Sequence, residues 1–152
     1  MNQNGKYLAI NAVIAALYVV LTTINPIGHG MIQIRVSEML AIIPFINRKF
    51  IPGILIGVTV ANFFSPLGYI DVLVGLSCAI VSYTISYFIK NLWINILQYA
   101  IVCGLIVSLM LKYVLGIPYW PSVVAIFLST LIVGLIGAII FNTLKTRLKL
   151  ID

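Results

Sequence analysis

One short stretch of the chain holds most of the side chains that could do chemistry. The segment from Gln33 to Glu38 contains an amide, a guanidinium, a hydroxyl and a carboxylate, and apolar segments flank it on both sides. A carboxylate at membrane depth is costly, so it usually faces a protein interior or a cavity together with a partner. Arg35 could be that partner, the two could jointly hold a polar ligand, or the pair could simply fasten a loop.

The composition around this stretch predicts a membrane protein. The chain is 62% hydrophobic and 8% charged, and its mean hydropathy is +1.19. These values exclude a soluble globular domain. We expect an all-α fold, a six-helix transmembrane bundle that forms a single domain over residues 1–152. The expected helices are Tyr7–Ile24, Ser37 to about Ile46, Ile51–Phe64, Asp71–Ile89, Leu92–Leu115 and Ser122–Leu144.

The second and third of these helices are unusually short. A helix needs roughly 20 residues to cross a bilayer, so either both are buried within the protein or Met31–Val36 dips into the membrane ahead of the second. Irregular backbone at that depth is tolerated only where protein or a water-filled cavity surrounds it. Both alternatives place Gln33 to Glu38 in a hollow lined by protein. Ser37 is the expected N-cap of the second helix.

The basic residues predict the orientation. With six crossings and a cytoplasmic N-terminus, seven Lys and Arg residues fall on the cytoplasmic side, and only Arg35 and Lys112 fall outside. This bias predicts that both termini are cytoplasmic. It also explains the net charge of +6 as topology, so we expect no nucleic-acid partner.

This orientation brings further polar residues to the outer side. Asn62 lies near the outer end of the third expected helix, and Tyr69 and Asp71 lie at the outer start of the fourth. Together with Gln33, Arg35 and Glu38 they predict an outward-facing pocket. Asp71 could equally cap the helix that starts there.

Small residues form regular stripes on three of the helices. Gly5, Ala9, Ala12 and Ala16 run down the first helix, Gly53 and Gly57 form a GxxxG on the third, and a similar stripe follows the fourth from Gly75. Such stripes allow close contact between helices. We expect the third and fourth helices to use theirs for packing inside the bundle, whereas the first helix could use its stripe to dock another protein.

Several classes of site have no pattern in the sequence. There is one histidine, and there is no HExxH, no CxxC pair and no GxxxxGK[ST], so we expect no metal, no cofactor, no enzymatic activity and no ATP site of the P-loop type. Cys78 and Cys103 both lie in apolar runs and are interpreted as buried small hydrophobes.

Three segments carry a resemblance to a known family. AVIAALYVVLT (12–22), IQIRVSEML (32–40) and IPGILIGVTVANFFSPLGYIDVLVG (51–75) resemble the queuosine-precursor transporters of the QueT type. These are substrate-binding S-components of energy-coupling factor (ECF) transporters. The likeness extends from the first helix to about Ser82; beyond that point only the hydropathy is similar.

The resemblance implies a function and a set of partners. It implies a multi-pass protein of the bacterial plasma membrane that captures a deazaguanine, either a queuosine precursor or the salvaged base. It also implies that the first helix contacts a transmembrane coupling subunit through Ala12 and Ala16, with Ala9 on the same stripe, and that two ATPase subunits supply energy.

The chemistry of the polar residues fits such a ligand. A guanine-like edge offers two adjacent N–H donors, which one carboxylate can accept, and Glu38 is the candidate. Asp71 could bind a cationic amine, and Gln33, Asn62 and Arg35 could bind the other ring edges. Tyr69, Tyr119 or Trp120 could stack on the ring or cover it. The alternative is a proton-coupled carrier in which Glu38 and Asp71 bind and release protons.

Overall fold

The computed structural model describes residues 3–25 and 34–148, and side chains as far as residue 144. Within these ranges the chain is helical and contains no strand. The elements are α1 (Gln3–Thr23), the 3-10 helix η1 (Val36–Ile42), α2 (Ile43–Ile46), the 3-10 turn η2 (Arg48–Phe50), α3 (Ile51–Phe63), α4 (Tyr69–Ile85), α5 (Leu92–Leu115) and α6 (Tyr119–Leu148).

The helices fall into long and short classes, as the sequence predicts for all but α4, which has 17 residues and is shorter than expected. Three are long and apolar enough to cross a membrane: α1, α5 and Tyr119–Leu144 of α6. With 13 residues, α3 extends about 20 Å at 1.5 Å per residue. The combined η1–α2 segment also extends about 20 Å, because a 3-10 helix rises about 2.0 Å per residue. Both fall short of the hydrocarbon core, which is about 30 Å thick, so the predicted short second and third helices are confirmed.

The second segment differs from its prediction in how it begins. Ser37 was expected as the N-cap of an α-helix, and this is wrong: Arg35 occupies the cap position, and a 3-10 helix follows it. Pro44 accounts for the last turn of this 3-10 helix, because it has no N–H with which to bond the carbonyl of Leu40 as an α-helix requires. That carbonyl instead accepts the N–H of Ile43, one residue closer, which is the 3-10 pattern.

Three other helices also have limits that differ from the prediction. The fourth helix ends at Ile85 rather than Ile89, and the guanidinium of Arg48 donates to the carbonyl of Ser86 just beyond this end (2.8 Å). The sixth helix begins at Tyr119 and continues to Leu148, because proline is tolerated in a first helical turn. The first helix begins earlier than expected, at Gln3.

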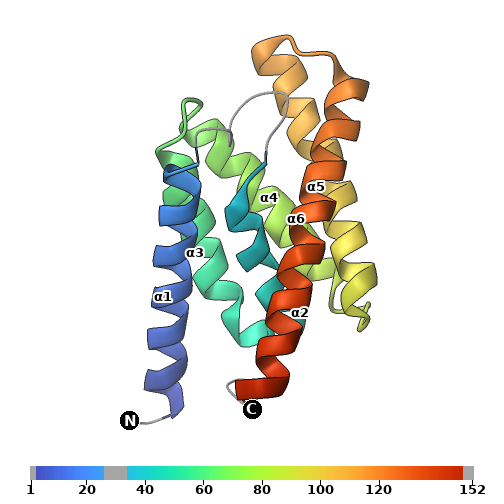
Figure 1. Ribbon diagram of the computed structural model, residues 1–152. Coiled ribbons are helices and arrows are strands. Elements are labelled where there is room, and N and C mark those ends of the chain that lie inside the picture. Colours follow the sequence, from blue (N-terminus) through green and yellow to red (C-terminus); the bar gives the residue numbers. More distant parts are fainter. Residues whose placement is uncertain (1–2, 26–33, 149–152) are drawn as a thin grey trace.

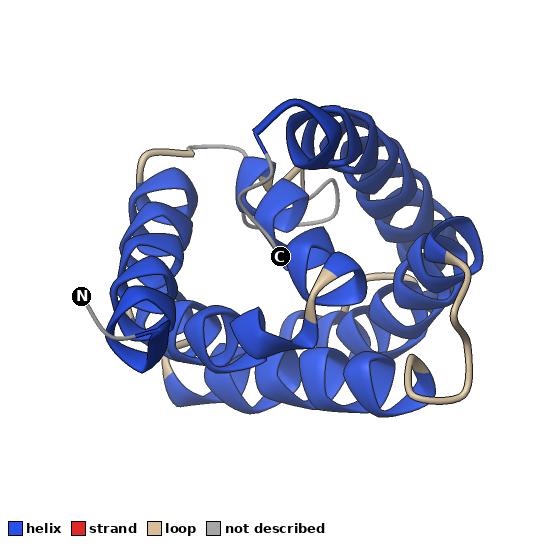
Figure 2. Cartoon of the chain, turned by 90° about the horizontal axis from the view of Figure 1, so that it is seen from below, coloured by secondary structure: helices blue, strands red, loops and turns tan. Residues whose placement is uncertain are grey.

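The elements form a ring around η1. In order around the bundle, α1 packs on α3, α3 on α4, α4 on α5 and α5 on α6, and η1 lies between α6 and α1 (Figure 2). Gln3 and Leu148 lie at the same end of the bundle (Figure 1). The ring therefore encloses η1, and the polar side chains that η1 carries have protein on several sides.

Two glycines bring α1 and α3 together. A Cβ added at Gly53 would lie 2.7 Å from the backbone oxygen of Asn11, and one added at Gly57 would lie 2.8 Å from Cβ of Tyr18. The small residues of α4 are also turned inward, with Ala79 and Ser82 almost fully buried. Packing inside the bundle, as predicted for the third and fourth helices, is therefore confirmed.

The outer surface of the bundle is apolar. Leu8 is 74% exposed and Ile132 is 55% exposed. A continuous apolar exterior is what a lipid environment requires and what a water-soluble monomer avoids.

Candidate functional site

The 3-10 helix η1 is fixed by hydrogen bonds from two sides of the ring. On the α1 side, the hydroxyl of Thr22 lies 2.8 Å from the hydroxyl of Ser37. On the α4 side, the hydroxyl of Tyr83 donates to the backbone carbonyl of Ala41 (2.9 Å). Because α6 packs along η1 as well, the side chains in the first turn of η1 are held in a fixed direction.

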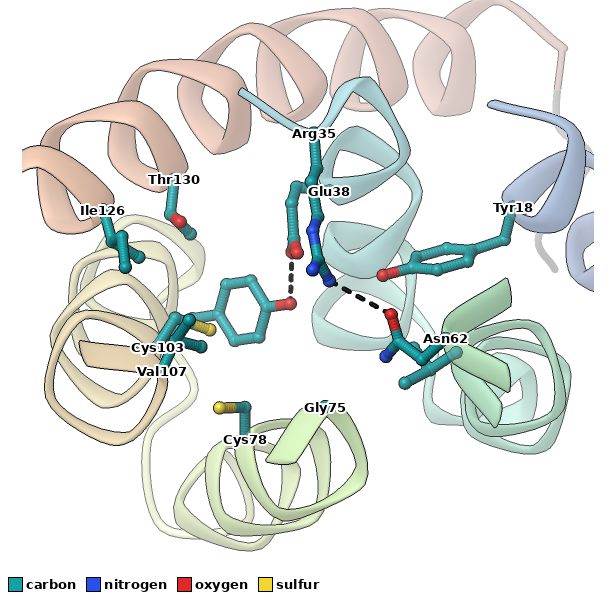
Figure 3. A pocket seen from close by; sticks show the side chains of 12 residues that line it. Tyr18, Arg35, Glu38, Asn62, Gly75, Cys78, Cys103, Val107, Ile126 and Thr130 are labelled. Atoms are coloured by element: carbon teal, nitrogen blue, oxygen red, sulfur yellow. Dashed lines mark hydrogen bonds between the residues drawn. The ribbon is translucent and has the colours of Figure 1, made fainter. Parts of the chain in front are cut away.

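These side chains reach a small internal cavity (Figure 3). Its lining comes from α1, the start of η1, α3, α4, α5 and α6. The lining residues are Tyr18, Arg35, Glu38, Val58, Asn62, Gly75, Cys78, Tyr99, Cys103, Val107, Ile126 and Thr130. The volume open to water is about 30 Å³, and one buried water needs roughly 10–15 Å³ on this measure. The space therefore suits about two water molecules.

Asn62 presents a hydrogen-bond donor to this cavity. Its Oδ1 accepts a hydrogen bond from Nη1 of Arg35 (3.1 Å). A guanidinium can only donate, so this bond fixes which end of the amide is oxygen. The other end, Nδ2, is buried and has no hydrogen-bond partner in the structure. Buried donors are rarely left without a partner, and such an exception calls for an explanation.

The position of the Asn62 amide depends on Gly75 across the cavity. A Cβ added at Gly75 would lie 2.2 Å from Nδ2 of Asn62 and 3.0 Å from a methyl of Val58. Only glycine therefore lets α4 pass this close to the amide.

Glu38 presents the complementary acceptor. One of its carboxylate oxygens accepts a hydrogen bond from the hydroxyl of Tyr99 on α5. The ring of Phe45 packs edge-on against Tyr99, with centroids 5.9 Å apart, and against Tyr83 at 5.2 Å. Figure 3 shows the carboxylate of Glu38 and the guanidinium of Arg35 reaching the same side of the cavity.

This arrangement defines the kind of ligand that the cavity can recognise. The carboxylate of Glu38 accepts from N–H groups, while Nδ2 of Asn62 donates to a carbonyl or ring nitrogen. Cys78, Cys103 and Val107 supply an apolar wall. Donors and acceptors on one side and an apolar surface on the other fit a flat polar heterocycle.

Of the predicted binding residues, the structure brings three together and leaves others elsewhere. Glu38, Arg35 and Asn62 line one cavity. Gln33 lies outside the described residues. Tyr69 is 71% exposed at the start of α4 and does not line the cavity.

Asp71 also lies away from the cavity. It is 5% exposed, and its carboxylate accepts a hydrogen bond from the hydroxyl of Ser65. Ser65 Oγ in turn accepts the backbone N–H of Leu67 (3.1 Å). Asp71 thus stabilises the turn between α3 and α4. The N-cap position of α4 is occupied by Gly68.

The small residues of α1 lie on its outer surface. Ala9, Ala12 and Ala16 are exposed, whereas Ile14 and Tyr18 face the core. The face of α1 that packs within the bundle is therefore not the face that carries these alanines.

Sequence reasoning did not assign most of the cavity lining, including four residues with polar or sulfur-containing side chains. Tyr99 and Thr130 were not identified, and Cys78 and Cys103, interpreted as buried hydrophobes, are buried but also line the cavity. A weak signal existed for Tyr99, since it follows Gln98 in an otherwise apolar run. Thr130 gives no such signal.

Comparison with known proteins identifies the family. The chain belongs to the QueT transporter family, whose sequence model matches residues 8–146. A curated relative, the queuosine precursor transporter QueT of Lactococcus lactis subsp. cremoris (strain MG1363), is 46% identical over 67 residues. This stretch is 42% of the chain and spans only 39% of the relative's length. No solved structure gives a significant match.

Proposed function

We propose that the chain captures a queuosine precursor, a deazaguanine base, as the substrate-binding subunit of an ATP-driven ECF importer. The observation that carries this proposal is the cavity in which a carboxylate and an unpartnered amide donor face one another in a member of the QueT transporter family. A deazaguanine edge has adjacent N–H donors beside a carbonyl oxygen, the complement of this pair.

Four polar residues of the cavity have roles in this proposal. Glu38 accepts from the N–H groups of the base, and its orientation is held by Tyr99. Asn62 donates through Nδ2 to the carbonyl oxygen, and Arg35 holds the amide in that orientation. A buried site that must satisfy specific donors and acceptors rejects analogues that lack them, because its own groups would be left unpaired.

The cavity must widen when the base enters. Its volume of about 30 Å³ is far below the roughly 300–1,000 Å³ of typical small-molecule pockets. The start of η1 lies toward the end of the bundle remote from Gln3 and Leu148 (Figure 1). We infer that the base enters from that end, through movement of the lining side chains.

The distribution of basic residues indicates how the chain is oriented in the membrane. Seven of the nine Lys and Arg residues belong to the end that contains both termini if the chain crosses six times. We infer that both termini are cytoplasmic and that the cavity opens outward, as capture before import requires.

The exposed stripe on α1 is the proposed contact with the coupling subunit. Ala9, Ala12 and Ala16 are exposed, and small side chains let a second helix approach closely within a membrane. In this proposal the coupling subunit and two ATPase subunits supply the energy.

Calorimetry on the purified chain tests the binding site. Glu38→Gln keeps the shape of the side chain but exchanges an acceptor for a donor, so we expect it to weaken binding of the aminomethyl base by about 2–4 kcal/mol. The matched control is Asp71→Asn, the same change outside the cavity, which should bind the base as the wild type does. A Glu38→Gln affinity within about threefold of wild type, a difference below roughly 1 kcal/mol, overturns the assignment.

A second comparison separates the roles of the two carboxylates. If Asp71→Asn weakens binding of the aminomethyl base but not of a base with a neutral side chain, Asp71 binds the amine. Uptake that needs no partner subunits and stops with an uncoupler would indicate a proton-coupled carrier instead.

A further inference from the structure

A second hollow lies at the other end of the bundle, between the turn that follows α2 and the C-terminal end of α4. Its volume is about 500 Å³, and the elements that bound it lie toward the end of the molecule where α1 begins and α6 ends (Figure 1). Three cationic side chains line it, Arg48, Lys49 and Lys90, together with the apolar side chains of Phe45, Ile46 and Ile89. The hollow is therefore separate from the cavity at Glu38.

Two of the cations are held in place by neighbouring groups. The guanidinium of Arg48 donates to the carbonyl of Ser86 (2.8 Å) and lies 4.3 Å from the ring centre of Tyr87. The ammonium of Lys49 donates to the hydroxyl of Tyr7 (3.0 Å) and lies over its ring. Charges that only set topology could lie anywhere in their loops, whereas these are fixed beside the hollow.

No negative side chain of the described residues balances this charge. The two acids in the described ranges are Glu38, which lines the other cavity, and Asp71, which lies in the first turn of α4. The hollow lies at the opposite end of α4, which is 17 residues long, or about 25 Å. Asp71 is too far away to form an ion pair with the cations of the hollow, so among the described residues the hollow is a cationic site.

The surroundings of the hollow indicate its depth in the membrane. Tyr87 is 57% exposed and Trp93 is 50% exposed, and both are close in sequence to Ile89 and Lys90. Exposed Tyr and Trp side chains gather at the level of the lipid headgroups. A cationic rim with an apolar lining at that level fits a molecule with an anionic head and an apolar body.

We propose that this hollow binds the phosphate headgroup of an anionic phospholipid. The guanidinium of Arg48 and the ammonium of Lys90 contact the phosphate oxygens, Lys49 adds attraction from the rim, and Phe45, Ile46 and Ile89 contact the upper part of the acyl chains. A soluble phosphate would make no contact with the apolar lining, whereas the acyl chains of a lipid would. The apolar lining therefore favours a phospholipid over a soluble phosphate. Basic pockets between membrane helices bind such headgroups in other proteins.

The proposal is tested with the full chain in nanodiscs. One set contains phosphatidylcholine alone and the other contains equal parts of phosphatidylcholine and phosphatidylglycerol. Lipids that remain on the extracted chain are counted by native mass spectrometry. We expect the wild type to retain phosphatidylglycerol in preference to phosphatidylcholine, and we expect Lys90→Gln to reduce this preference about fivefold, the value of roughly 1 kcal/mol per cation.

Lys6→Gln is the matched control, because Lys6 is an exposed lysine at the start of α1 that does not line the hollow. It should leave the preference within about twofold of wild type. If Lys6→Gln and Lys90→Gln reduced the preference for phosphatidylglycerol equally, the attraction would be a diffuse effect of surface charge and the proposal would be overturned. So would an unchanged preference in Lys90→Gln.

A second measurement separates lipid from soluble phosphate. Thermal unfolding in detergent is followed with added phosphatidylglycerol or added inorganic phosphate. Stabilisation by the lipid that Lys90→Gln removes supports the proposal. Equal stabilisation by inorganic phosphate would show a site for a soluble anion and overturn it. If the wild type showed no preference for an anion and Lys90→Gln prevented binding of the partner subunits, the hollow would be a protein interface and the proposal would be overturned.

Discussion

Replacing Gly75 by alanine tests how the cavity is built. The new Cβ would lie 2.2 Å from Nδ2 of Asn62, more than 1 Å inside ordinary van der Waals contact of about 3.5 Å. The amide must therefore move, and its hydrogen bond to Arg35 (3.1 Å) must stretch or break. Alanine is otherwise favoured over glycine in a helix by about 1 kcal/mol, so α4 itself should not be weakened.

The expected loss of ligand affinity follows from these contacts. The bond at stake joins the neutral amide of Asn62 to the carbonyl oxygen of the base, and leaving one buried partner of such a bond unsatisfied costs about 1–3 kcal/mol. If Asn62 no longer presents its donor because Arg35 no longer holds it, the affinity for the base should fall roughly 5-fold to 150-fold. Calorimetry on purified Gly75→Ala measures the change. The matched control is Gly104→Ala on α5, where an added Cβ would lie no closer than 3.3 Å to its neighbours; its affinity should stay near that of wild type.

A double-mutant cycle decides whether the effect acts through Asn62. In an Asn62→Ala chain the obstructed amide is absent, so adding Gly75→Ala should change the affinity by less than about 0.5 kcal/mol. If Gly75→Ala costs as much without the amide as with it, or if the single variant binds within about threefold of wild type, the reasoning about this cavity is refuted.

Four further predictions concern other parts of the chain. Tyr99→Phe should weaken binding of the base by about 1–3 kcal/mol in calorimetry, because Glu38 loses the donor that orients it; unchanged affinity would contradict that role. Ala12→Leu should leave binding to the isolated chain intact but prevent co-purification with the coupling subunit and ATP-driven uptake; lost binding with partners retained would show internal packing instead. Gly57→Leu should lower the unfolding temperature by several degrees, because its Cβ alone would lie 2.8 Å from Tyr18; an unchanged temperature would refute the close contact. A reporter that works only in the cytoplasm should be active when it is fused to the C-terminus. Activity at that position of a reporter that works only after export would contradict the predicted topology.

The hydropathy pattern predicted the helices well because each long apolar run had a clear polar or proline-containing boundary. Leu92–Leu115 was predicted with the observed limits: Asn91 caps its start by accepting the backbone N–H groups of Trp93 and Ile94, and Gly116 ends it in a left-handed conformation with φ of 68°. The 3-10 character of the last turn of η1 was not predicted, because it depends on how one missing N–H at Pro44 redirects the bonds of the preceding turn.

The candidate site could be predicted only in part. Glu38, Arg35 and Asn62 stand out because polar side chains are rare in this sequence, and the structure brings them to one cavity. Asp71 stands out for the same reason, yet its hydroxyl partner Ser65 keeps it at a turn. Tyr99 contacts Glu38 from 61 residues away, a pairing that depends on how α5 packs against the ring and that no local pattern encodes.

The 3-10 winding of η1 makes this segment intolerant of changes in length. Three residues complete each turn of such a helix, so inserting or deleting a single residue rotates everything beyond it by about 120°. Since Glu38 must point between α5 and α3 to meet Tyr99 and the cavity, one such rotation would turn its carboxylate into the wall of the ring. Point substitutions can be absorbed at many positions of this bundle, whereas between Arg35 and Pro44 the number of residues itself determines whether Glu38 reaches the cavity.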